Sequence, residues 1–174
     1  MGNVFEFRNT ITRLANATQY AVGDQIASRQ RAKDPVLDTG MKTVLGNGSP
    51  MIIRRVVLSK DDGDQTSALF RLHLFSANPY ATPEAKDTGD NAPLNLAGAD
   101  PADYLGAFDF DMATPPEIYD TGAGNAATGV PLVGSEIMVP HMANEGPFGL
   151  LEARGTYTPH SGEVFTIKIQ YLPG

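Results

Sequence analysis

Apolar and polar residues alternate with a period of two in several segments of this chain, which is the pattern of a β-strand with one buried face. Residues 164–172 show the alternation most regularly. One face of this segment carries apolar residues, namely Phe165, Ile167, Ile169 and Tyr171. The other face carries the polar residues Thr166, Lys168 and Gln170. The pattern predicts a closing strand whose apolar face points into a core.

Two neighbouring segments, residues 51–60 and 67–76, are rich in β-branched and other apolar residues. The stretch between them contains DDGDQT, which is typical of a turn. We therefore predict a β-hairpin. The two faces of its second strand differ in polarity, with Phe70, Leu72 and Leu74 on the core side and Arg71 and His73 on the other side.

Shorter runs predict further strands at residues 20–27, 105–112, 135–139 and 148–154. A single helical turn is expected at residues 100–104, where Asp100 is a suitable N-cap and Pro101 a suitable first helical residue. Three long loops rich in glycine and proline separate the strands, at residues 28–50, 78–99 and 113–134.

Residues 4–14 alternate less regularly and predict either a strand or an extended N-terminal arm. We divide the chain accordingly into an arm or strand at residues 1–19 and a β-sandwich domain at residues 20–174. Seven or eight strands, long crossovers and scarcely any helix predict an all-β, single-domain β-sandwich with Greek-key or jelly-roll-like connections. A chain of 174 residues buries enough surface to fold as one such domain without disulfide bonds or a structural metal.

Composition excludes several classes of protein. The net charge is −7, which argues against binding of nucleic acid. There is no cysteine, so a disulfide framework and a thiolate metal site are both excluded. The longest apolar runs are far shorter than the roughly 20 residues that span a bilayer, so no membrane association is expected.

The acidic residues Asp61, Asp62 and Asp64 are candidate calcium ligands, because calcium prefers carboxylate oxygens. They lack the spacing of a calcium-binding loop, and a turn alone explains aspartate there, so we expect a turn. Asp109 and Asp111 share one face of a predicted strand. Carboxylates work as an acid–base pair only across a cleft, so we expect this pair to be solvated.

The histidines His73, His141 and His160 show neither His-x-His nor HExxH spacing. The glycine-rich residues 121–129 lack the preceding strand and following helix of a phosphate loop. The sequence therefore predicts no catalytic residue, no metal site and no cofactor, and we expect that the chain is not an enzyme. The one local cation cluster, Arg29, Arg31 and Lys33, is expected either to solvate its loop or to dock on an acidic partner surface.

The chain resembles the capsid decoration (cement or minor capsid) proteins of tailed bacteriophages in four segments: YAVGDQIA, PMIIRRVVLSKDDGDQTSALFRLHLFSANP, DNAPLNLAGADPADYLGAFDF and FGLLEARGTYTPHSGEVFTIKIQYL. The resemblance extends over residues 20–172. It implies a jelly-roll-like sandwich, often trimeric, on the outer capsid surface where major capsid subunits meet. It also implies that the protein is made in the bacterial host cytoplasm, resides in the virion and needs no cofactor.

We therefore expect a structural virion protein that binds the major capsid protein as a homo-oligomer, for which the resemblance implies a trimer, and that stabilises the shell. Contacts with the capsid or another subunit are assigned to Phe5, Phe7 and Ile11 of the N-terminal segment and to Arg29 and Arg31. The alternative is a tail, fibre or baseplate module that binds another virion protein or a glycan. A cupin-like or hydrolytic enzyme is a third hypothesis, and the missing His/Glu cluster argues against it.

Overall fold

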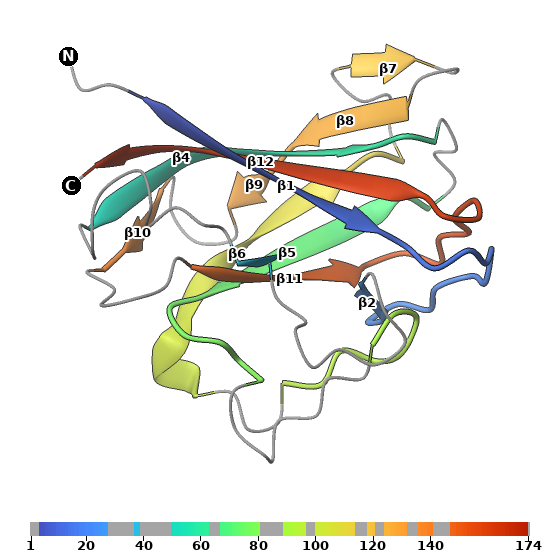
Figure 1. Cartoon of the computed structure of the whole chain (residues 1–174), viewed down its shortest axis with the longest axis horizontal. Helices are drawn as coiled ribbons and strands as arrows, with labels where there is room; N and C mark the ends of the chain where they lie inside the picture. Colours follow the sequence, from blue (N-terminus) through green and yellow to red (C-terminus); the bar gives the residue numbers. More distant parts are fainter. Residues whose placement is uncertain are drawn as a thin grey trace.

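The computed structural model describes residues 4–27, 37–38, 50–62, 67–80, 89–96, 100–113, 118–120, 124–131, 136–140 and 147–173. These residues form two sheets of antiparallel strands (Figure 1). The first sheet has the order β1 (Phe5–Thr12), β12 (Val164–Pro173), β4 (Met51–Lys60), β8 (Gly124–Thr128) and β7 (Ile118–Asp120), and β10 (Ile137–Val139) also pairs with β4. The second sheet has the order β2 (Gln25–Ile26), β11 (Phe148–Ala153), β5 (Leu69–Phe75), β6 (Tyr104–Asp111) and β9 (Val130–Pro131), and β3 (Leu37–Asp38) also pairs with β11.

The strand order is that of a jelly roll. Four antiparallel pairs are nested along the chain: β1 with β12, β2 with β11, β4 with β8, and β5 with β6. The first and third pairs lie in one sheet and the second and fourth in the other, so the paired ribbon wraps around the core. The predicted all-β sandwich with jelly-roll-like connections is thereby confirmed.

Apolar side chains from both sheets fill the space between them. The alternation of the sequence explains this directly, since Phe165, Ile167 and Ile169 of β12 are all at most 1% exposed. Phe165 packs edge-on against Phe70 of β5, with ring centroids 5.3 Å apart, so this contact joins the two sheets. The predicted inward face of residues 164–172 is confirmed.

The predicted hairpin between residues 51–60 and 67–76 is wrong. Both strands exist, as β4 and β5, but they lie in opposite sheets and do not pair. β4 pairs with β12, β8 and β10, whereas β5 pairs with β11 and β6. The connection after Lys60 thus carries the chain from one sheet to the other. In this arrangement, both strands turn apolar side chains toward the core between the sheets.

A second apolar cluster covers the outer face of the second sheet at one end. Phe75, Phe148 and Leu150 form it, with Tyr80, Leu94 and Leu96 packed against them from the connection between β5 and β6. This connection ends in one 3₁₀ turn, η1 (Pro101–Asp103). The Asp100 side chain accepts a hydrogen bond from the Ala102 N–H at 2.8 Å, as the predicted N-cap requires.

Candidate functional site

The N-terminal segment contains a strand of the first sheet. β1 pairs with β12 from Phe5 to Thr12 and forms one edge of the sheet. Phe5 and Phe7 are half-buried and pack on the core, and Ile11 is buried in it. Their assignment as contacts with a capsid or another subunit remains a prediction. Arg29 and Arg31, the other two predicted contact residues, lie outside the described residues.

On the outward face of β1, one basic side chain lies beside another basic side chain of β12. Arg8 lies directly opposite Lys168 of β12 in the strand register. Two like charges in this position disfavour each other. The adjacent pair, Glu6 and Gln170, is joined by a hydrogen bond of 3.3 Å between the Gln170 amide and Glu6 Oε2. The exposed face of β1 therefore carries an acidic and a basic residue two positions apart, with a second cation beside the basic one.

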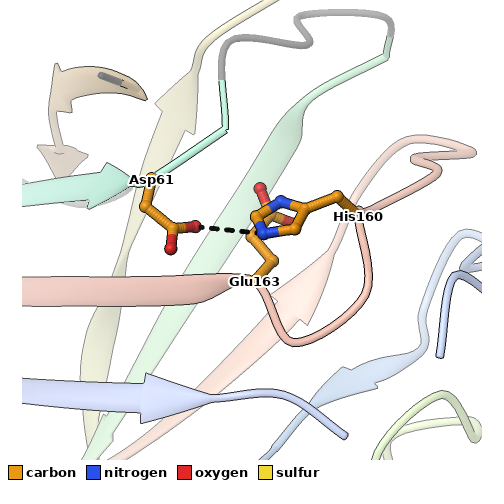
Figure 2. Close-up of side chains that lie close together, drawn as sticks. All are labelled: Asp61, His160 and Glu163. Atoms are coloured by element: carbon orange, nitrogen blue, oxygen red, sulfur yellow. Dashed lines mark ion pairs between the residues drawn. The ribbon is translucent and has the colours of Figure 1, made fainter. Parts of the chain in front are cut away.

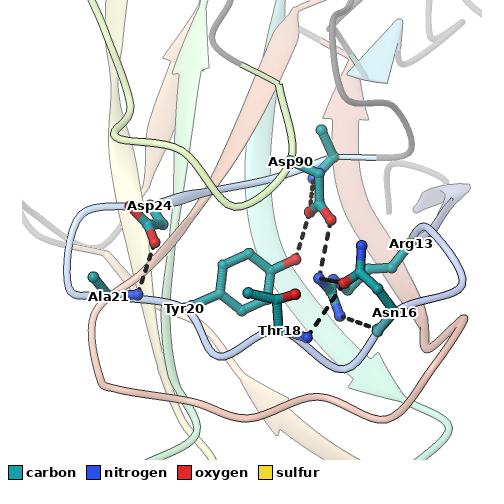
Figure 3. Close-up of polar contacts among 8 residues, drawn as sticks. Arg13, Asn16, Thr18, Tyr20, Ala21, Asp24 and Asp90 are labelled. Atoms are coloured by element: carbon teal, nitrogen blue, oxygen red, sulfur yellow. Dashed lines mark hydrogen bonds and ion pairs between the residues drawn. The ribbon is translucent and has the colours of Figure 1, made fainter.

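A buried polar cluster lies at the end of β1 (Figure 3). The Arg13 guanidinium contacts Asp90 Oδ2 at 3.0 Å, and both side chains are fully buried. The Tyr20 hydroxyl donates to Asp90 Oδ1 at 2.5 Å, and the Ala27 N–H donates to the same oxygen at 3.1 Å. Burial raises the pKa of the Tyr20 hydroxyl and the Asp90 charge raises it further, so the group stays protonated as a donor. The cluster ties the chain after β1 to the connection that contains Asp90.

A second buried ion pair lies where β4 ends. Lys60 Nζ is 3.4 Å from Glu163 Oε1, and both side chains are fully buried. The Tyr157 hydroxyl donates to Glu163 Oε1 at 2.5 Å and accepts from Lys60 Nζ at 3.0 Å. Burial raises the pKa of Glu163, although the Tyr157 hydrogen bond and the Lys60 charge act in the opposite direction. All three groups hold the corner of the sandwich together.

Asp61 and His160 lie beside this pair at the surface (Figure 2). One donor atom from each of Asp61, His160 and Glu163 lies within 4.8 Å of the others. His160 also approaches Asp62, with 3.6 Å between Nδ1 and Oδ2. The Lys60 ammonium already supplies the cation that Glu163 requires, so the geometry is explained without a metal. Asp64, the third aspartate of the predicted turn, and His141 lie outside the described residues.

The outer face of the second sheet carries two further pairs. Arg71 donates two hydrogen bonds to Asp109 across paired strands, of 2.7 Å from Nε and 2.9 Å from Nη2. Asp109 is therefore bound to a guanidinium, and Asp111 instead accepts from the Ala113 N–H at 2.9 Å. The two carboxylates have separate structural partners, which is not the arrangement of an acid–base pair.

Beside this pair, His73 Nε2 lies 2.9 Å from Glu152 Oε2, and Arg154 donates to Glu152 Oε1 at 3.0 Å. Burial raises the pKa of Glu152, but the hydrogen bonds from His73 and Arg154 outweigh it, so the net pKa is lowered. The Tyr104 hydroxyl lies 3.3 Å from His73 Nδ1. Tyr104 is 42% exposed and lines a mostly apolar surface hollow of about 340 Å³. The other lining residues are His73, Phe75, Leu96, Asp100 and Pro101.

The sequence did not reveal the two buried ion pairs, because each joins residues far apart in the chain. Arg13 and Asp90 are 77 positions apart. One signal was available for each basic member: Lys60 is in phase with the buried Val56 and Leu58, and Arg13 is in phase with the buried Ile11. A charged residue at an inward position of a strand indicates a buried partner.

No family model matches this chain, and no curated protein matches it. Among solved structures, the cryo-EM structure of a virus-like particle of the extra small virus of the giant freshwater prawn Macrobrachium rosenbergii is similar at 10% identity. The alignment covers 97% of this chain and 78% of that chain, with a TM-score of 0.30. A likeness at this level carries no argument about fold or function. Among the described residues, no helix has the length and hydropathy that crossing a membrane requires.

Proposed function

We propose that this chain is a non-enzymatic structural protein of a virion. It binds the outer surface of a tailed-phage capsid, contacts the major capsid protein and stabilises the shell as a symmetric oligomer, for which a trimer is expected. The jelly-roll strand order is the observation that carries the proposal, since this fold occurs in viral capsid proteins, in lectins and in cupins. The resemblance of residues 20–172 to capsid decoration proteins selects the first of these.

The interior of the sandwich supports the choice against a cupin-like enzyme. Cupins hold a metal with clustered histidines inside the roll, whereas apolar side chains such as Ile53, Leu58 and Leu72 fill the interior here. His73 is buried on the outer face of the second sheet against Glu152, and His160 lies at the surface beside Asp62, so neither histidine lines the apolar interior. In the described part of the chain, surfaces and strand edges therefore remain as the places where function resides.

The proposed role follows from mass action. A protein that binds the assembled shell and not the free subunits stabilises the shell by its binding free energy. Symmetry repeats one modest contact in each subunit, so avidity supplies what a single contact lacks.

The direct test adds the purified protein to shells that lack it. We expect co-sedimentation with bare shells that saturates at a stoichiometry set by the shell symmetry, and a higher temperature of shell disruption. Binding to neither shells nor their free subunits would overturn the proposal. Light scattering after size exclusion tests the oligomer: a mass of about three times 18.5 kDa is expected for a trimer.

A tail or fibre module that binds a glycan is the second candidate, and the hollow at Tyr104 favours it. An exposed aromatic ring beside a carboxylate, here Asp100, is the arrangement that stacks on a sugar ring and accepts its hydroxyl hydrogens. Binding to immobilised host cell-wall glycans that is lost in Tyr104→Ala and kept in Tyr104→Phe supports this candidate. Unchanged binding in Tyr104→Ala excludes the hollow.

A further inference from the structure

The outer edge of β1 presents its backbone groups in a defined order. Arg13, one residue past β1, donates its N–H to the Glu163 carbonyl on the β12 side at 3.0 Å. Thr10 instead donates its N–H to the Asn9 side chain at 2.6 Å. Backbone groups of alternate residues point to opposite sides of a strand. The odd-numbered residues of β1 therefore bond to β12, and the even-numbered ones direct their N–H and C=O groups toward the open edge, on which no strand of the described residues pairs.

The same even-numbered residues carry the exposed side chains of β1, Glu6 and Arg8 among them. Arg8 faces Lys168 in a pair without mutual backbone bonds, where side chains approach most closely. Within the described residues, Glu6 is bonded to Gln170 and not to either cation. Arg8 would gain from an acidic residue on its open side.

A second copy of β1 would supply that acidic residue. If two β1 strands pair antiparallel about a two-fold axis at Phe7, residue numbers in each opposed pair sum to 14. Glu6 then lies opposite the partner's Arg8, and Arg8 lies opposite the partner's Glu6. Both are even-numbered residues, so each pair exchanges two backbone hydrogen bonds across the open edge.

The register also suits the inner face of the strand. Phe7 is half-buried at the edge of the core, and the two-fold axis would place it against the partner's Phe7. Aromatic pairs across antiparallel strands are favourable, and each ring would lose exposed apolar surface. Charged residues on an edge strand usually oppose edge pairing. Here the charges are complementary in one register and unfavourable in its neighbours.

We propose that β1 is a self-complementary assembly edge whose occupant is β1 of a second copy of this chain, in the register that opposes Glu6 to the partner's Arg8. One strand pair buries less than the roughly 1,200 Å² of a stable interface, so the contact is weak alone and gains strength by repetition. This inference rests on the proposed function in one respect, namely that a symmetric capsid lattice repeats the contact. In that lattice, the β1 contact joins neighbouring oligomers across two-fold axes.

Register-specific disulfide capture tests the geometry, and the absence of native cysteine makes it clean. Residues opposed in a bonded pair lie about 5.5 Å apart at Cα, within disulfide reach. We expect a mixture of Glu6→Cys and Arg8→Cys full-length proteins to form at least about tenfold more linked dimer than either variant alone. Ser161→Cys, exposed on the connection before β12, measures random collision. A mixture that links no better than this control, or no better than each single variant, overturns the proposal.

Charge exchange tests the energetics. Glu6→Arg and Arg8→Glu each turn two symmetry-related attractions into repulsions, so each should raise the dissociation constant for self-association about tenfold. The double variant restores complementarity and should return to the wild-type value in sedimentation velocity. If the double variant associates no better than the singles, the pairing is wrong.

The two proposals fail separately. If the protein self-associates through β1 but does not bind bare shells, the assembly edge is supported and the virion role is overturned. The opposite outcome has two parts: all three charge variants bind shells with wild-type stoichiometry and affinity, and no register-specific linking occurs. It supports the virion role and overturns the assembly edge.

Discussion

Lys60 and Glu163 form an ion pair, 3.4 Å between Nζ and Oε1, with both side chains fully buried. The pair joins the end of β4, where the chain leaves the first sheet, to the residue just before β12. Lys60 Nζ also donates to the Asp62 carbonyl at 2.7 Å, so it fixes the start of the crossover. The corner between the sheets thus depends on a charge pair that has no access to water.

Replacement of Lys60 by methionine should destabilise the protein by about 3–5 kcal/mol, because it leaves the Glu163 carboxylate buried without its cation. Methionine keeps the length and most of the volume of lysine, so packing changes little. Urea unfolding gives the free energy. The double variant Lys60→Met with Glu163→Gln should lose less than the sum of the two single changes. Strict additivity would contradict the coupling.

The raised pKa of Glu163 predicts a pH dependence. Above pH 4.5, its ordinary value, the folded protein retains a proton that the unfolded chain has released. This contribution to stability is fully present below pH 4.5 and is lost as the pH rises through the folded pKa. The stability difference between wild type and Glu163→Gln should therefore fall as the pH increases above 4.5. Urea unfolding at a series of pH values measures it, and a rising difference would refute the sign.

Glu152 predicts the opposite dependence. Its pKa is lowered, because hydrogen bonds from His73 and Arg154 outweigh burial. The folded protein thus holds the carboxylate ionised where the unfolded chain binds a proton, and stability falls as the pH drops below 4.5 through the folded pKa. The difference between wild type and Glu152→Gln should shrink over that range. The same series of pH values is applied to Glu163→Gln and Glu152→Gln. If the stability difference from wild type changes with pH in the same direction for both variants, one of the two pKa assignments is wrong.

The sequence predicted the strands and their faces better than their partners. The composition of residues 51–60 and 67–76 indicated two strands, and alternation in the second placed Phe70, Leu72 and Leu74 in the core, which is correct. Neither signal could identify neighbours, because a short turn-like connection serves a hairpin and a sheet-to-sheet corner equally. β4 pairs instead with β12, through contacts such as Leu58 with Ile167. Such long-range pairing leaves no local pattern.

The polar clusters show the same limit. Asp90 lies in a loop rich in polar residues, where nothing distinguishes a buried carboxylate from a solvated one. Only its contacts with Arg13, Tyr20 and the Ala27 N–H identify it as buried. The charge pattern of Glu6 and Arg8, by contrast, is visible in the sequence, but its meaning depends on knowing that β1 is an edge and that Lys168 lies opposite.

Gly124 should be intolerant of any side chain. It begins β8 with φ of +106°, a conformation that residues with a Cβ rarely adopt. An added Cβ would also collide with the backbone carbonyl oxygen of Lys60 on β4, which cannot move without breaking the pairing of β4 with β8. We expect Gly124→Ala to cost roughly 2–4 kcal/mol of unfolding free energy. Gly162→Ala is the matched control.

Gly162 also has a positive φ, +75°, but no heavy atom lies within 4 Å of an added Cβ. Its replacement by alanine should cost only the conformational strain, about 1–2 kcal/mol. Urea unfolding of both variants separates the collision at Gly124 from the backbone preference that the two glycines share. If both variants lose the same unfolding free energy, the backbone at Lys60 moves to accept the added Cβ at no cost. The close approach of Gly124 to Lys60 then contributes nothing to the stability of the first sheet.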